Sequence, residues 1–118
     1  MKNKWNNIIF NFFFIISSLI IVLIFFKNIL LTNALLFTIT IIGLLKWKSK
    51  LSLIIFVTFG LLFGIGEIIV SSLGPWKYAI TSTLTIPSWL FILWGNSALF
   101  IHQTIREIRK SGIKENKL

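Results

Sequence analysis

The residue best suited to chemistry in this chain of 118 residues is Glu67, a carboxylate within a long apolar stretch. No other acidic residue occurs before Glu107. An ionisable side chain in hydrocarbon is costly unless it is neutral, paired or facing water, so it marks a functional site by default. A polar and aromatic turn, residues 74–78, begins seven residues further on. If the protein is an enzyme, Glu67 is the only strong candidate acid or base, and whether it catalyses a reaction stays open.

Small residues share the helical face of Glu67. On a helix with 100° per residue, Gly60, Gly64, Glu67 and Ser71 fall within about 60° of one another. Small residues four apart let a second backbone approach closely, as in membrane helix packing. We therefore predict that Gly60, Gly64 and Ser71 pack against protein and that Glu67 faces the same way. The pattern does not distinguish packing within one chain from a homodimer.

The last apolar stretch brings further polar and aromatic groups to a similar depth. On a helix that runs the opposite way, Asn96 would lie about 12 Å from the outer end, near the level of Glu67. A hydrogen bond between Glu67 and Asn96 would satisfy both side chains. Pockets for small molecules combine aromatic walls with a few polar groups. We predict an outward-opening ligand-binding cavity, covered by the loop 74–87 and formed by Glu67, Trp76, Tyr78, Trp94 and Asn96.

Each of these residues also has a purely structural interpretation. Glu67 can be a protonated carboxyl group that only joins two helices. Trp76 and Tyr78 can be anchors at the membrane interface, where such side chains are enriched. We interpret His102 as an interface residue, because no second His, Asp or Cys stands at ligand spacing. We expect neither a metal ion nor a cofactor.

The elements that must position these residues are long apolar segments. Apolar residues make up 56% of the chain and charged residues 13%. A soluble protein of this size has too small an interior to bury so many apolar side chains. In lipid the backbone must form its hydrogen bonds internally, which favours helices. We predict an all-α integral membrane four-helix bundle, a single transmembrane domain over 1–118. Its parts are spans at about 8–26, 29–45, 51–73 and 88–105, the outer loop 74–87 and a cytoplasmic tail 106–118.

The basic residues predict the orientation of this bundle. The net charge is +9, but the cations stand at the ends of the apolar runs and form no continuous patch, so we expect no nucleic acid partner. A cytoplasmic N-terminus places ten Lys and Arg inside and only two, Lys27 and Lys77, outside. The positive-inside rule therefore predicts that both termini are cytoplasmic. The partner that we expect from the apolar spans is the membrane lipid bilayer.

The second half of the chain resembles a known group of proteins. Glu67 is followed after six residues by Gly74-x-Trp76-x-Tyr78, then by Ile86-Pro87-x-Trp89-Leu90 and Trp94-Gly95. Over residues 60–105 this resembles an uncharacterised family of small four-span integral membrane proteins of archaea and bacteria. A fainter similarity links the membrane Glu, the Gly and Tyr after it, and the Pro–Trp pair to carotenoid-biosynthesis membrane proteins. Those proteins act on isoprenoid chains, which implies Glu67 as a general acid, although they have about twice as many spans and further acidic residues.

Three hypotheses for the function follow. The first is binding of a lipid or isoprenoid in a cavity near Glu67. The second is a proton-coupled small-molecule transporter that acts as a homodimer through Gly60 and Gly64. In size and span count the chain is similar to the small multidrug-resistance transporters, whose essential Glu lies in the first helix rather than the third. The third is a structural or assembly subunit of a membrane complex.

Overall fold

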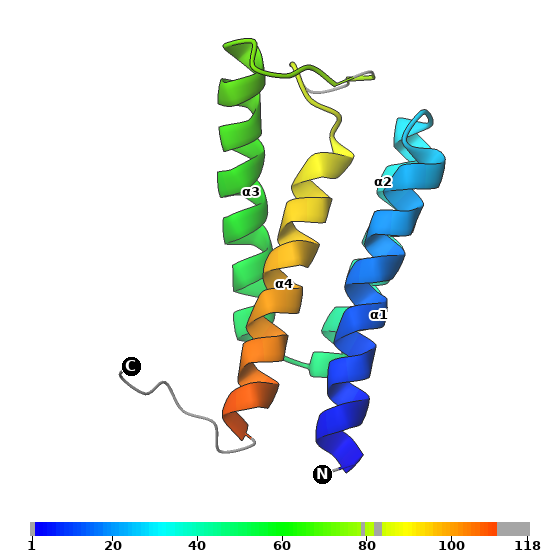
Figure 1. Cartoon of the computed structure of the whole chain (residues 1–118), viewed down its shortest axis with the longest axis vertical. Helices are drawn as coiled ribbons and strands as arrows, with labels where there is room; N and C mark the ends of the chain where they lie inside the picture. The colour runs from blue at the N-terminus through cyan, green and yellow to red at the C-terminus, as the bar shows by residue number, and fades with distance from the viewer. Residues whose placement is uncertain (1, 79, 82–83, 111–118) are drawn as a thin grey trace.

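The chain folds into a bundle of α-helices. The computed structural model describes residues 2–78, 80–81 and 84–110. In this part of the chain the helices are α1 (Lys2–Phe25), α2 (Ile29–Trp47), α3 (Lys50–Ser72) and α4 (Trp89–Lys110), as Figure 1 shows. The prediction of an all-α, four-helix bundle is confirmed.

The largest differences from the predicted spans are at the start of α1 and the end of α4. α1 begins at Lys2 rather than near residue 8, and α4 continues to Lys110, into the segment predicted to be a tail. The rest of that tail, 111–118, lies outside the described residues. Polar side chains cap the starts of α2 and α3. The Asn28 side chain accepts a hydrogen bond from the Leu31 N–H, and the Ser49 side chain accepts one from the Ser52 N–H. Such caps satisfy backbone donors that a helix start leaves unpaired.

α4 is the central helix of the bundle. It lies between α3 on one side and the hairpin of α1 and α2 on the other (Figure 1), and it contacts all three. The start of α1, the turn between α2 and α3 and the end of α4 lie at one end of the molecule. The segment between α3 and α4 lies at the other end, which we call the Glu67 end.

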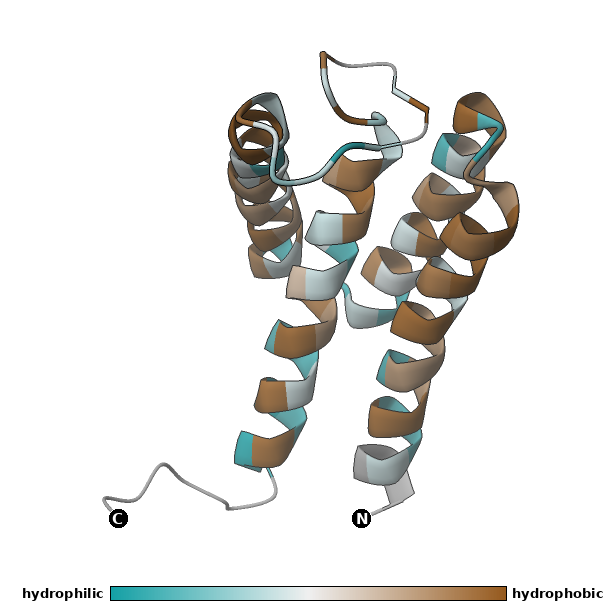
Figure 2. Ribbon diagram, turned by 45° about the horizontal axis from the view of Figure 1, so that its top comes forward, coloured by the Kyte–Doolittle hydropathy of each residue, from teal (hydrophilic) through white to brown (hydrophobic). Residues whose placement is uncertain are grey.

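Three of the helices have the length and composition of membrane spans. α1, α2 and α3 are long and apolar enough to cross a membrane, whereas α4 is not among them. Figure 2 shows the same contrast, since α4 carries more polar positions than the ribbons around it. Large side chains on the outward faces, such as Leu23, Leu30 and Leu62, are exposed. Apolar faces of this extent are expected where lipid replaces water around a protein.

Several polar side chains of α4 are buried inside the bundle. Asn96 is fully buried, and its Oδ1 accepts a hydrogen bond from Thr40 Oγ1 of α2 at 2.6 Å. Its Nδ2 donates to Ser18 Oγ of α1 at 3.2 Å. One amide therefore connects three helices in the middle of the bundle.

A second set of polar contacts lies toward the opposite end from Glu67. Gln103 Nε2 of α4 donates to Ser52 Oγ of α3 at 2.6 Å. Glu107 Oε1 accepts a hydrogen bond from Asn7 Nδ2 of α1 at 3.0 Å. Buried polar groups destabilise a fold unless they are bonded, so these contacts fix the rotation of α4 among its neighbours.

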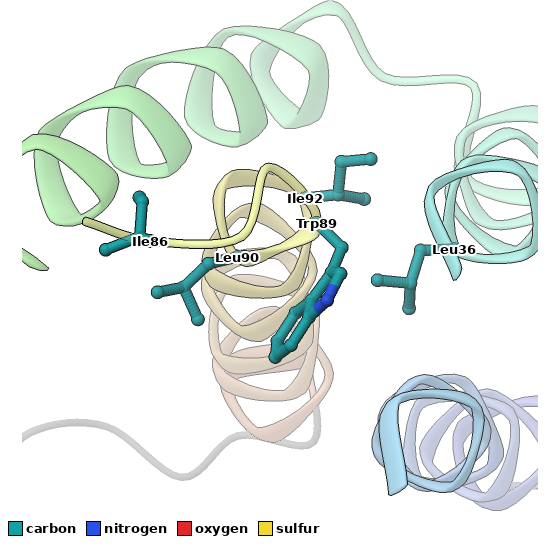
Figure 3. Close-up of a cluster of buried hydrophobic side chains, with 5 residues drawn as sticks. All are labelled: Leu36, Ile86, Trp89, Leu90 and Ile92. Atoms are coloured by element: carbon teal, nitrogen blue, oxygen red, sulfur yellow. The ribbon is translucent and has the colours of Figure 1, made fainter. Parts of the chain in front are cut away.

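An apolar cluster closes the Glu67 end of the bundle. Figure 3 shows Leu36 of α2 beside Trp89 and Ile92 of α4, with Ile86 and Leu90 completing the buried cluster. Ile86 comes from the connecting segment and is fully buried. The segment before α4 is therefore part of the core.

α3 and α4 approach closely where glycine replaces a side chain. A Cβ built on Gly60 would lie 2.9 Å from the carbonyl oxygen of Phe91, and one on Gly64 would overlap the Phe91 ring. Ser71, on the same stripe, is buried as well. The structure thus places the small-residue stripe against α4 of the same chain, so a homodimer through this stripe would have to displace α4.

We predict that Gly60→Ala destabilises the protein by about 1–3 kcal/mol, the usual range for forcing atoms into a packed contact. The obstacle is backbone, so it cannot rotate away. Gly66→Ala is the matched control, because a Cβ there has nothing within 4 Å and alanine favours helix over glycine. The measurement is the free energy of unfolding in detergent micelles. Equal effects of the two substitutions would contradict the close packing of α3 and α4.

Candidate functional site

Glu67 is bonded to two aromatic side chains of the connecting segment. The Tyr78 hydroxyl donates to Glu67 Oε2 at 2.6 Å, and the Trp76 indole N–H donates to the same oxygen at 3.3 Å. Three of the five predicted ligand-binding residues therefore lie together. We call Glu67, Trp76 and Tyr78 the Glu67 cluster.

The chain reverses direction to bring these residues together. Beyond α3, Gly74 adopts a φ of +98°, a conformation that glycine allows most easily. The hydroxyls of Ser71 and Thr85 are 2.6 Å apart, and Thr85 Oγ1 also donates to the carbonyl oxygen of Ile68 at 3.3 Å. Both ends of the segment are thus attached to α3, and Trp76 and Tyr78 lie over its last turns.

The phenol of Tyr78 holds its proton strongly. Burial, the hydrogen bond to the Glu67 carboxylate and the negative charge of that carboxylate together raise the pKa of Tyr78 to about 12. Loss of the proton would place a phenolate beside a carboxylate. At neutral pH Tyr78 is therefore a neutral donor to Glu67, and among the described residues Glu67 makes no ion pair.

The prediction of a hydrogen bond between Glu67 and Asn96 is wrong. Asn96 bonds to Thr40 and Ser18, on the side of α4 that faces α1 and α2. Depth alone suggested the pair, but a hydrogen bond also requires that both side chains turn toward each other. Asn96 therefore lies apart from the Glu67 cluster.

Trp94 lines an apolar cavity along the surface of α3 and α4. Its ring lies 4.9 Å from that of Phe63, measured between centroids. The cavity has a volume of about 400 Å³ and an almost wholly apolar lining. Its residues are Ile55, Phe59, Phe63, Trp94, Ser97, Ala98, Ile101 and His102.

Glu67 does not line the cavities that the structure shows near it, so it does not form a cavity floor as predicted. Tyr78 lines two smaller hollows beside the connecting segment, of about 260 and 360 Å³, and Glu67 lines neither. The larger apolar cavity begins at Phe63, one helical turn from Glu67. The five predicted residues are thus divided among the Glu67 cluster, the wall of the α3–α4 cavity and the buried network of Asn96.

The sequence interpretation missed the other walls of the α3–α4 cavity. Phe59 and Phe63 are four residues apart on α3. Trp94, Ala98 and Ile101 recur at intervals of four and three on α4. These intervals place side chains on one helical face and would have identified two facing apolar stripes.

We predict that the tyrosine ionises with a pKa near 12 in the native protein and that Glu67→Gln lowers this pKa toward the ordinary value of 10. The substitution removes the negative charge but leaves the burial. Tyr78 is the only tyrosine in the chain, so phenolate absorbance near 295 nm reports it alone.

The same shift gives a pH dependence. Because the pKa is higher in the fold, the contribution of Tyr78 to stability is complete below about pH 10 and is lost as the pH rises toward 12. An unchanged tyrosine titration in Glu67→Gln would refute the contact between the two residues.

Comparisons with family models, curated proteins and solved structures found no match for this chain. The family resemblance described from the sequence therefore stays a prediction.

Proposed function

We propose that this protein is a four-span integral membrane protein that binds the hydrocarbon part of a lipid or isoprenoid in the α3–α4 cavity. The observation that carries the proposal is the cavity of about 400 Å³ with walls of Phe59, Phe63 and Trp94. Its volume is in the range of small-molecule sites, and an almost wholly apolar lining suits a hydrocarbon chain.

The fourth span in this proposal is α4. Its 22 residues extend over roughly 33 Å, enough to cross the hydrocarbon core. Its buried side chains Asn96, Gln103 and Glu107 bond to α2, α3 and α1, so they need no water. A helix that lipid alone would not accept can cross a membrane inside such a bundle.

The orientation in this proposal has both termini in the cytoplasm. Lys46, Lys48 and Lys50 lie at the end of α2, in the turn that follows and at the start of α3, and the last turns of α4 carry Arg106 and Arg109. These elements lie at one end of the bundle (Figure 1), and cations of this kind are retained on the cytoplasmic side.

In this proposal the Glu67 cluster holds the connecting segment over the outer end of α3. Glu67 accepts from Trp76 and Tyr78, which ties two aromatic side chains to the helix that forms one wall of the cavity. The same bonding favours a second candidate function, an assembly subunit in which Glu67 only stabilises the fold.

The test is mass spectrometry of small molecules that co-purify in native lipid discs. We expect one lipid or isoprenoid class to be enriched with the wild type and reduced about tenfold in Phe63→Ala, because the ring forms part of the cavity wall. Phe37→Ala is the matched control: Phe37 is an exposed ring on α2 and does not line the cavity.

Two results would decide against a ligand site. Unselective lipid profiles from all three proteins would favour the assembly subunit. An equal loss from Phe63→Ala and Phe37→Ala would show that the lipids coat the bundle without a specific site.

A further inference from the structure

A second cavity lies at the end of the bundle opposite the Glu67 cluster. It has a volume of about 630 Å³ and lies where the turn between α2 and α3 meets the last turns of α4. We call it the basic cavity, and its lining residues are Trp47, Lys48, Ser49, Leu51, His102, Ile105, Arg106, Arg109 and Lys110.

The basic cavity carries uncompensated positive charge. The nearby carboxylate of Glu107 accepts from Asn7 and lies 3.7 Å from the ammonium group of Lys110. Among the residues that the structure describes, no carboxylate pairs with Lys48, Arg106 or Arg109. A concave surface that gathers unpaired cations from two elements attracts anions and raises their local concentration.

The geometry suits a phosphate group. Arg106 and Arg109 are three residues apart, so their side chains leave the same side of α4. Lys48 lines the same cavity from the end of α2, where it adopts the left-handed backbone conformation (φ +51°). Guanidinium groups bind phosphate oxygens in pairs, and an ammonium group adds a point charge.

The basic cavity lies next to the apolar one. His102 contributes to the lining of both, so the two cavities adjoin at this side chain along the groove of α3 and α4. Leu51 and Ile105 add apolar side chains to the lining of the basic cavity. The groove is thus apolar along its length and cationic at one end, which is the pattern of a molecule with a hydrocarbon chain and an anionic head.

We infer that the basic cavity binds the phosphate of an anionic lipid head group, with the hydrocarbon chain in the α3–α4 cavity. This inference rests on the proposed function and names the class of its ligand. Basic pockets between helices on the cytoplasmic side of membrane proteins are suited to such head groups. Cations that only set the orientation of the protein in the membrane need not gather in a cavity. Lys46 and Lys50, for example, are exposed at the same end without lining it.

The test is native mass spectrometry of the full chain in vesicles of equal parts dioleoylphosphatidylglycerol and dioleoylphosphatidylcholine. We expect the wild type to retain the anionic lipid preferentially. The double variant Arg106→Gln/Arg109→Gln should lose that preference by roughly tenfold or more, since each cation near a membrane surface contributes substantially to binding anionic lipid.

The matched control is Lys46→Gln/Lys50→Gln. It removes the same charge from the same end of the bundle but leaves the basic cavity intact, so its preference should change less than threefold, roughly, if the cavity rather than the surface potential selects the lipid. Circular dichroism checks that both double variants keep their helices. An equal loss in both variants would overturn the inference in favour of unspecific attraction.

Further results separate this inference from the proposed function. Equal retention of both lipids by the wild type would overturn the head-group site while leaving a lipid-binding groove. Retention of neither lipid would overturn both. Inorganic phosphate is added as a third arm: displacement of the anionic lipid by millimolar phosphate would overturn the lipid as ligand and assign the cavity to a free phosphate compound.

Discussion

Each buried polar side chain of α4 needs a hydrogen-bond partner inside the bundle, because the helices around it offer mostly hydrocarbon. The partners are single residues spread over three helices: Ser18 on α1, Thr40 on α2 and Ser52 on α3. A rotation of α4 by a fraction of a turn would break all three contacts at once. The arrangement of the other helices therefore depends on this set of bonds, more than on apolar packing, which tolerates many rotations.

This constraint explains the shape of the groove. With Asn96 of α4 turned toward α1 and α2, another face of α4 meets α3 at Gly60 and Gly64, where the two backbones come close. Beside this contact the larger side chains Phe63 and Trp94 stand at the rim. The cavity is thus a consequence of how α4 is fixed by its polar face on one side and its close glycine contacts on another.

The presence of four helices was predictable from the hydropathy of the sequence, but the start of α1 and the end of α4 were not, because both helices continue into polar residues beyond the apolar runs. The association of Glu67 with Trp76 and Tyr78 was predictable as a neighbourhood, since the turn follows α3 after a few residues. The partner of Asn96 was not predictable from depth, because the rotation of each helix decides which side chains meet. A signal was present all the same: Asn96, Gln103 and Glu107 are spaced by seven and four, which places them on one face.

The two ends of the groove differ in a way that the fold itself creates. Beyond one end, a helical turn past Phe63, the carboxylate of Glu67 is satisfied by neutral donors of its own chain. At the other end the cations of the basic cavity have no described carboxylate to pair with, apart from Lys110. Charge attracts a ligand only where the protein has not already neutralised it, so the groove has a polarity along its length.

The central place of α4 also bears on how the protein is made. α4 follows its partners in the chain, and it is the helix that does not have the composition of a span. During synthesis, α1, α2 and α3 can enter a bilayer on their own hydrophobicity before α4 leaves the ribosome. α4 can then form hydrogen bonds between its amide side chains and Ser18, Thr40 and Ser52 of the helices made before it. In the proposed four-span topology, insertion of α4 is in effect a binding reaction between a polar helix and a receptor of three helices, and the biogenesis of the whole bundle depends on that final step.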